Sequence, residues 1–311
     1  MSRPCFAMPS FATCAIAGIA VVVSLIPAPG LGQSSPASGP ARRPSTAPPA
    51  QAPADQAPAN RSDADAAFLA KANSLYYSTT KLGLTGFDCT VRPDWVNIFK
   101  TVLKGSPSAA DEKPIAVLNS AKITIHARLT GPGSGLEWTP GPTALPDQES
   151  FELLEYMHQS TGQALQTFMQ FWTPFVNGSV IPDPAAGSEV KKTETGHTIH
   201  TMDGSASITE VLDAGNVVKQ FNVETQGAKI VFEPSYKPTP NGLLVSGFAA
   251  RIQPPGAAPD KEQKMNVVVE YQTVNGFLIP HTLSMDVAGT GNFTFTLDGC
   301  TVNPAAQSSA Q

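Results

Sequence analysis

The stretch that decides the fold is Val267-Val-Val-Glu-Tyr-Gln-Thr-Val-Asn-Gly-Phe-Leu-Ile-Pro280. Two runs rich in β-branched and aromatic residues flank Asn275-Gly276, a dipeptide favoured in tight hairpins because both residues tolerate a positive φ. The stretch therefore predicts strands over 265–274 and 277–287. These strands must be antiparallel, since a parallel return needs a connection of about a dozen residues or more.

The same pattern recurs on both sides of this hairpin. Short apolar runs alternate with turns such as Asp213-Ala-Gly-Asn216 and Pro240-Asn-Gly242. Strands joined by such short loops pair with their neighbours in sequence order, which predicts an antiparallel meander. Its other strands are expected over 190–202, 206–213, 216–225, 228–234, 243–253 and 292–302.

The part of the chain before this meander adds two strands and three helices. Alternating apolar residues predict strands over 87–92 and 121–130, and a proline- and glycine-rich loop follows the second of them. A first helix begins at Asp63 and includes Tyr76, and a short second helix covers 94–104. The longest helix is expected over 147–172.

This longest helix determines the expected architecture. Asp147 stands at its N-cap position, and apolar residues recur every three or four positions until Pro174 ends it. So broad an apolar stripe must be covered, and the strands offer an apolar face that covers it. We therefore expect an α+β fold, in which a large curved antiparallel sheet, a half-barrel-like meander, carries helices packed on its concave face. Residues 63–304 are long enough to form this as a single domain.

The N-terminal segment of the chain predicts export. Residues 1–32 combine one early charge, an apolar centre and small residues, which is the order of a cleaved signal peptide. The alternative is an uncleaved membrane anchor, although the apolar centre is shorter than the roughly 20 residues that a spanning helix needs. Residues 33–62 form a Pro/Ala/Ser-rich linker and 305–311 a polar tail, both expected to be disordered. The predicted location is periplasmic or secreted.

Two cysteines, Cys89 and Cys300, follow the predicted signal peptide. In an oxidising compartment they are expected to form a disulfide that ties the first strand to the last. By alternation, Cys300 falls on the face opposite to Phe293, so a bulge at Gly299 is needed to redirect it. The alternative is two separate buried thiols.

The sequence carries no catalytic signature. It has neither a Gly-x-Ser-x-Gly elbow nor a phosphate-binding glycine loop, so we expect no enzyme, no catalytic residues and no cofactor. The formal net charge is -5 and no stretch concentrates lysine and arginine, which argues against nucleic acid as a partner. Glu152 and Glu155 are expected on a solvated helix face.

The five histidines do not predict a metal site. His197 and His200 are three apart on an expected strand, so their side chains point to opposite faces and cannot chelate one ion. His126, His158 and His281 are each expected to be solvated or hydrogen-bonded.

The candidate ligand-binding residues lie on the longest helix. Its apolar side chains occupy more than one face, so part of this surface is available to line a hydrophobic hollow. The alternative for the same residues is core packing alone. The residues expected to line the hollow are Phe151, Leu154, Met157, Leu165, Phe168 and Trp172.

The stretch 267–280, together with Leu283 and the strand over 292–301, resembles the closing hairpins of the periplasmic lipoprotein carriers, the LolA/LolB-like superfamily. The resemblance implies a half-barrel with a hydrophobic hollow suited to acyl chains. Together with the predicted export and the lack of a catalytic signature, we expect an exported non-enzymatic protein that holds an apolar or acyl ligand, a lipid or an acylated protein, between the sheet and helix 147–172. We expect no membrane-spanning helix in the mature chain. The alternative is a structural or protein-interaction module of the cell envelope that has no small-molecule ligand.

Overall fold

The computed structural model describes residues 63–103, 105–130, 135–140, 147–177, 180–182, 187–203, 206–258, 261–289 and 291–304. The predicted signal peptide, linker and tail lie outside these residues. The helices are α2 (Asp63–Asn73), α3 (Trp95–Leu103), α4 (Glu112–Ser120) and α5 (Gln148–Val176), with a 3-10 helix η1 at Ala109–Asp111. The strands are β1 (Leu84–Pro93), β2 (Ile123–Arg128), β3 (Gly135–Pro140), β4 (Glu189–Lys192), β5 (Gly196–Asp203), β6 (Ala206–Asp213), β7 (Val218–Thr225), β8 (Ala228–Thr239), β9 (Gly242–Gln253), β10 (Gln263–Val274), β11 (Phe277–Val287) and β12 (Gly291–Pro304).

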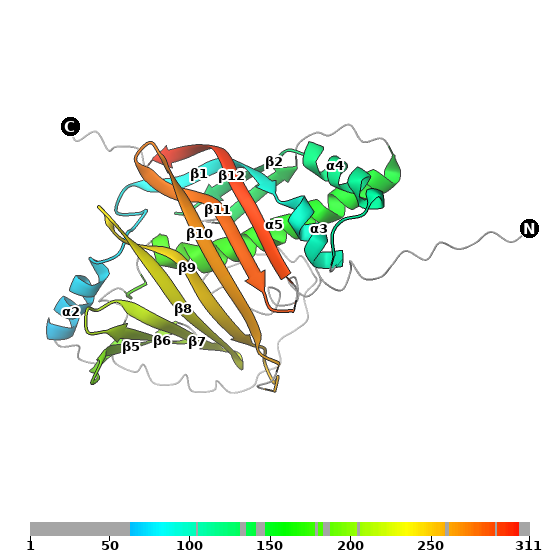
Figure 1. Cartoon of the computed structure of the whole chain (residues 1–311). Helices are drawn as coiled ribbons and strands as arrows, with labels where there is room; N and C mark the ends of the chain where they lie inside the picture. The colour runs from blue at the N-terminus through cyan, green and yellow to red at the C-terminus, as the bar shows by residue number, and fades with distance from the viewer. Residues whose placement is uncertain are drawn as a thin grey trace, which may run out of the picture.

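The strands of the described residues form one antiparallel sheet of 12 strands in the order β3-β2-β1-β12-β11-β10-β9-β8-β7-β6-β5-β4. From β4 to β12 each strand pairs with its successor, which confirms the predicted meander. β1 inserts beside β12, so the first and last strands are neighbours (Figure 1). β3 and β4 are the two edges, and the sheet is not closed. The α+β class is confirmed.

The predicted hairpin turns have the backbone that their residues favour. Asn275 and Gly276 adopt φ values of 49° and 85°, as a tight turn between β10 and β11 requires. Asn216 has a φ of 64° in the turn between β6 and β7.

The Cys89–Cys300 disulfide is present, as predicted. β1 and β12 shift register at Cys89, so that Gly299 and Cys300 together oppose this one residue. Gly299 has a φ of 57°, the left-handed conformation of a glycine bulge. The bulge turns the Cys300 side chain toward Cys89, which confirms the role predicted for Gly299.

Two strand predictions were wrong. The expected strand over 190–202 is two strands, β4 and β5, because the polar run between them turns back on itself, and the Thr193 N–H donates to the Gly196 carbonyl at 2.9 Å. β3 lies in the segment expected to be a loop. It pairs with β2 in register, with Trp138 opposite Ile125, even though glycines and prolines surround it.

The helix boundaries also needed correction. α5 does not stop at Pro174 but continues to Val176, because a proline near the end of a helix removes only one backbone donor. The first helix ends at Asn73, and Tyr76 instead forms a parallel bridge with Leu243 of β9. α4 was not predicted.

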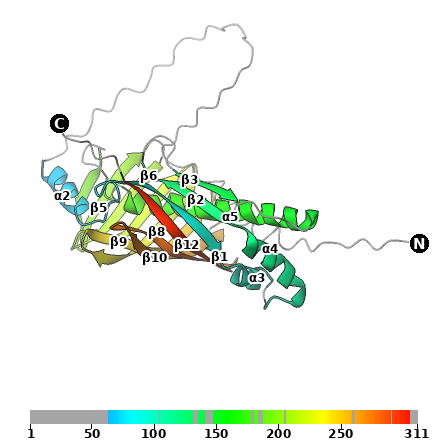
Figure 2. The same cartoon turned by 90° about the horizontal axis from the view of Figure 1, so that it is seen from above.

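α5 is the central packing element. In Figure 1 it lies behind the strands, and in Figures 1 and 2 α3 and α4 lie toward one end of it while α2 lies beyond the other. Its side chains contact residues of β1, β3, β7, β8, β9 and β10. Asp147 is its N-cap, as predicted, and accepts a hydrogen bond from the Ser150 N–H at 2.8 Å.

Candidate functional site

Five phenylalanines join the C-terminal half of α5 to the sheet, and we call them the phenylalanine cluster. Consecutive rings lie 5.2 to 6.4 Å apart, at the separations where edge-on and offset stacking are favourable. The cluster consists of Phe171 and Phe175 on α5, Phe221 on β7, Phe232 on β8 and Phe248 on β9.

The local sequence explains this convergence. Phe171 and Phe175 are four residues apart on α5, so they share one face of the helix. Phe221 and Phe232 are directly opposite each other on β7 and β8, and their side chains therefore lie on the same face of the sheet.

The phenylalanine cluster is not uniformly buried. Phe171 and Phe221 are only half-buried, whereas the other three members are buried. Ile208 of β6 and Val223 of β7 continue the same face, are directly opposite each other, and are also half-buried. These apolar side chains of α5 and of the sheet are partly accessible from outside, and we call them the accessible apolar surface: Phe171, Phe221, Ile208 and Val223.

A buried carboxyl group adjoins this surface. Glu210 of β6 lies directly between Ile199 of β5 and Phe221 of β7 and is 3% exposed. Its Oε2 atom has no hydrogen-bond partner among the described residues. Burial raises the pKa of Glu210 well above its ordinary value, because removing water disfavours the charged form.

Two tyrosines lie on the same side of the sheet. The rings of Tyr76 and Tyr236 are 5.4 Å apart in an edge-on arrangement. The Tyr76 hydroxyl accepts a hydrogen bond from the Val218 N–H at 2.7 Å, whereas the Tyr236 hydroxyl is buried without a partner in the described part of the chain. Burial raises the pKa of Tyr76 to about 12.

Between β9 and β10 the sheet separates, and Tyr271 bridges the gap. The pairing of these strands runs only as far as Gly247 and Val268. Beyond that point the Tyr271 hydroxyl donates to the Val245 carbonyl at 2.6 Å and accepts from the Trp172 indole N–H at 2.8 Å. Through Tyr271, Trp172 thereby connects α5 to β10 and to β9.

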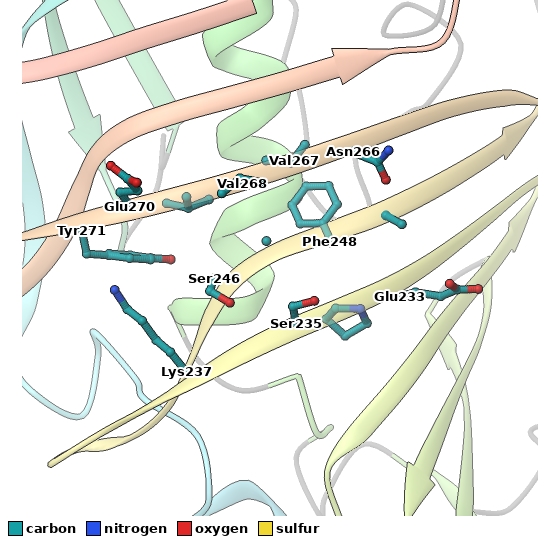
Figure 3. A pocket seen from close by; sticks show the side chains of 14 residues that line it. Glu233, Ser235, Lys237, Ser246, Phe248, Asn266, Val267, Val268, Glu270 and Tyr271 are labelled. Carbon is teal, nitrogen blue, oxygen red and sulfur yellow. The ribbon is translucent and has the colours of Figure 1, made fainter. Parts of the chain in front are cut away.

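An outer hollow of about 980 Å³ lies above this separation, on the face opposite to α5 (Figure 3). The Lys237 ammonium lies 4.5 Å from the centre of the Tyr271 ring, a cation–π contact. Val268 is 55% exposed at its edge. The polar residues that line it are Glu233, Ser235, Lys237, Ser246, Asn266 and Glu270.

A smaller hollow, of about 340 Å³, lies over β1 and β2. Asp88 Oδ1 is 2.6 Å from His126 Nδ1, and Asp88 Oδ2 accepts from the Asn303 amide at 3.2 Å. His126 is thus hydrogen-bonded, as predicted.

The six predicted ligand-binding residues occupy different environments on α5. Phe151 is 48% exposed near its N-terminal end, whereas the other five are buried. Phe168 stacks on Trp172 at 5.9 Å, and Trp172 meets Phe87 of β1 edge-on. None of the six lines either hollow described above.

Three of the other histidines lie on strands, His197 and His200 on β5 and His281 on β11. His197 and His200 lie on opposite faces of β5, since His197 is opposite Leu212 and His200 opposite Thr209. His281 hydrogen-bonds the Leu297 carbonyl at 3.0 Å.

His158 is buried rather than solvated. It was expected to be solvated or hydrogen-bonded, but it is buried against Trp138, and no described residue pairs with its Nε2 atom. Burial lowers the pKa of His158. Glu152 and Glu155 are exposed, as predicted.

The chain matches no protein-family model, no curated protein and no solved structure. None of the helices within the described ranges is long and apolar enough to cross a bilayer.

Sequence reasoning missed Glu210, Tyr236 and the strand half of the phenylalanine cluster. One signal was available for Glu210: alternation along β6 places it on the same face as Ile208 and Leu212. A charged residue at an inward position of a strand is unusual enough to mark a candidate site.

Proposed function

We propose that this protein is an exported, non-enzymatic binding protein of the lipoprotein-carrier type that holds an apolar or acyl ligand between α5 and the sheet. The observation that carries the proposal is the accessible apolar surface formed by Phe171, Phe221, Ile208 and Val223. An apolar surface that the fold leaves partly open is a candidate site for an apolar ligand.

The proposal includes a sheet that curves around α5, with the helix on its concave side. β12 and β11 separate β1 from β10, so β1 and β10 are three strand spacings, or about 14 Å, apart along the sheet. The single side chain of Trp172 nevertheless contacts Phe87 on β1 and Tyr271 on β10. Convergence of separated strands on one side chain supports curvature toward the helix.

Export is part of the same proposal. The disulfide between Cys89 and Cys300 suits an oxidising compartment, which agrees with cleavage of residues 1–32 and a periplasmic or secreted location.

The rival function is a structural or protein-interaction module without a small-molecule ligand. Burial of five of the six predicted lining residues in side-chain contacts favours it, because these residues have a packing role already.

Purified mature protein separates the two functions. Under the proposal, native mass spectrometry and solvent extraction detect a co-purified acyl compound, and the delipidated protein binds the apolar fluorophore N-phenyl-1-naphthylamine saturably. A protein that yields no lipid and does not bind the fluorophore is the interaction module.

A pair of variants locates the site. Val223→Trp fills the accessible surface between α5 and β7 and is expected to weaken fluorophore binding about tenfold or more, because a bulky ring occupies the ligand's place. Val268→Trp makes the same substitution at an exposed position on the opposite face and leaves binding unchanged. Equal effects of the two variants would place the site elsewhere.

A further inference from the structure

Glu210 lies at one end of the accessible apolar surface. Phe221, its direct neighbour on β7, belongs to the phenylalanine cluster, and Ile208, two residues before it on β6, continues the same face. The end of a hydrocarbon chain lying along this surface would therefore lie beside Glu210. Because Glu210 is only 3% exposed, its neighbouring side chains must shift for a head group to reach the carboxyl group.

Two oxygen-bearing side chains at this end carry an atom that has no hydrogen-bond partner in the described part of the chain. The Oε2 atom of Glu210 and the hydroxyl of Tyr236 are both buried and unpaired among the described residues. Buried polar groups in folded proteins are nearly always hydrogen-bonded, so each unpaired group requires an explanation. The nearby Tyr76 hydroxyl shows the contrast, because the Val218 N–H satisfies it.

The charges around the carboxyl group restrict what binds there. Burial is the cause of the raised pKa of Glu210, and no cation among the described residues offsets it. The titratable groups whose charges interact with it are Tyr76 and, on β8, Tyr236. His197 of β5, whose Nδ1 atom is also unpaired within the described ranges, is directly opposite Leu212, two residues along β6 from Glu210. A neutral carboxylic acid offers one O–H donor and one carbonyl acceptor, and a tyrosine offers a second donor.

We propose that Glu210 and Tyr236 bind the uncharged polar end of an amphiphile, such as an alcohol, ester or amide, whose hydrocarbon chain lies against the phenylalanine cluster. This inference rests on the proposed function and adds the class of head group. An anionic head group is rejected because it would enter a dry site without a cation. An ammonium head group is disfavoured because it would require Glu210 to ionise in the same environment.

The test uses four ligands with the same 12-carbon chain: dodecanol, dodecanamide, laurate and dodecylammonium. Each is titrated against the protein loaded with N-phenyl-1-naphthylamine at pH 7.5, below its micelle concentration. Dodecanol and dodecanamide are expected to displace the fluorophore at concentrations about tenfold lower than the two charged ligands, because sites built to hydrogen-bond a neutral group discriminate strongly.

Three variants assign the preference to this site. Glu210→Leu removes the head-group partner and makes the four ligands compete within about threefold of one another, whereas Glu210→Gln keeps a neutral donor and acceptor and retains the preference. Tyr236→Phe reduces the preference by about threefold to tenfold, the effect of one lost hydrogen bond. Glu233→Leu, on the outer face of β8, changes nothing.

The outcomes separate this inference from the proposed function. Saturable fluorophore binding without discrimination among the four ligands overturns only the head-group assignment, as does tightest binding of laurate or dodecylammonium. A preference that persists in Glu210→Leu overturns it as well. If the fluorophore does not bind the wild-type protein, both proposals fail.

Discussion

Removing the Cys89–Cys300 disulfide tests how the two ends of the domain hold the sheet together. The bond spans 211 residues and joins β1 to β12. The loop-entropy relation gives about 5 kcal/mol for a loop of this length at 25 °C, and losses measured for native disulfides are about 2–5 kcal/mol. We expect Cys89→Ala/Cys300→Ala to lower the free energy of unfolding by about 3 kcal/mol. For a domain of this size the corresponding fall in Tm is about 6–12 °C.

The assay is urea unfolding followed by tryptophan fluorescence, with and without reductant. The double variant is insensitive to reductant, and the reduced wild-type protein matches it, because both have lost the same covalent link. The strands β1 and β12 keep their hydrogen-bonded register, so the folded secondary structure is unchanged by circular dichroism. A loss below about 1 kcal/mol, against the typical range for native disulfides, would refute the argument that the link restricts the unfolded chain.

Three further predictions test the bulge, the strand separation and the helix cap. Gly299→Ala loses about 1–2 kcal/mol of unfolding free energy in the same assay, because φ of 57° is left-handed, while Gly105→Ala, at an open position without a positive φ, loses much less. Tyr271→Phe loses about 1–3 kcal/mol, measured by thermal and urea unfolding, because the buried Trp172 N–H loses its acceptor. The pKa of Asp147 is lowered to about 2, first by the hydrogen bond that Lys113 donates to its carboxylate at 2.9 Å and then by the Ser150 N–H at the helix N-terminus, so the ionised form of Asp147 stabilises the fold. That contribution is present above pH about 4 and is lost as the pH falls toward 2, whereas Asp147→Asn keeps the cap and loses this pH dependence in unfolding curves.

Each of these three predictions has a result that would contradict it. Equal losses for the two glycine variants would remove the case for a strained bulge. A Tyr271→Phe variant as stable as the wild type would mean that the indole N–H has another acceptor. Parallel pH profiles for the wild type and Asp147→Asn would show that the carboxylate plays no part in stability.

The sequence was sufficient for the features that depend on local chemistry. Asn275-Gly276 needs a positive φ and therefore makes a hairpin wherever it stands between two strand-forming runs. Asp147 caps a helix because its short side chain reaches the free backbone N–H groups. The strand order of the meander follows from these turns, and the disulfide followed from two cysteines in a chain that reads as exported.

The tertiary structure decided what depends on contacts between distant residues. β3 is a strand because β2 offers its edge, despite the glycines and prolines around it. Tyr76 lies outside its predicted helix because the residues on either side of it, Leu75 and Tyr77, form backbone hydrogen bonds with Leu243 of β9. Glu210 becomes a candidate binding group only when Phe221 and Tyr236, which lie on other strands, remove it from water. Alternation along a strand tells which side chains share a face, but only the packed sheet determines which of them meet and which remain without a partner.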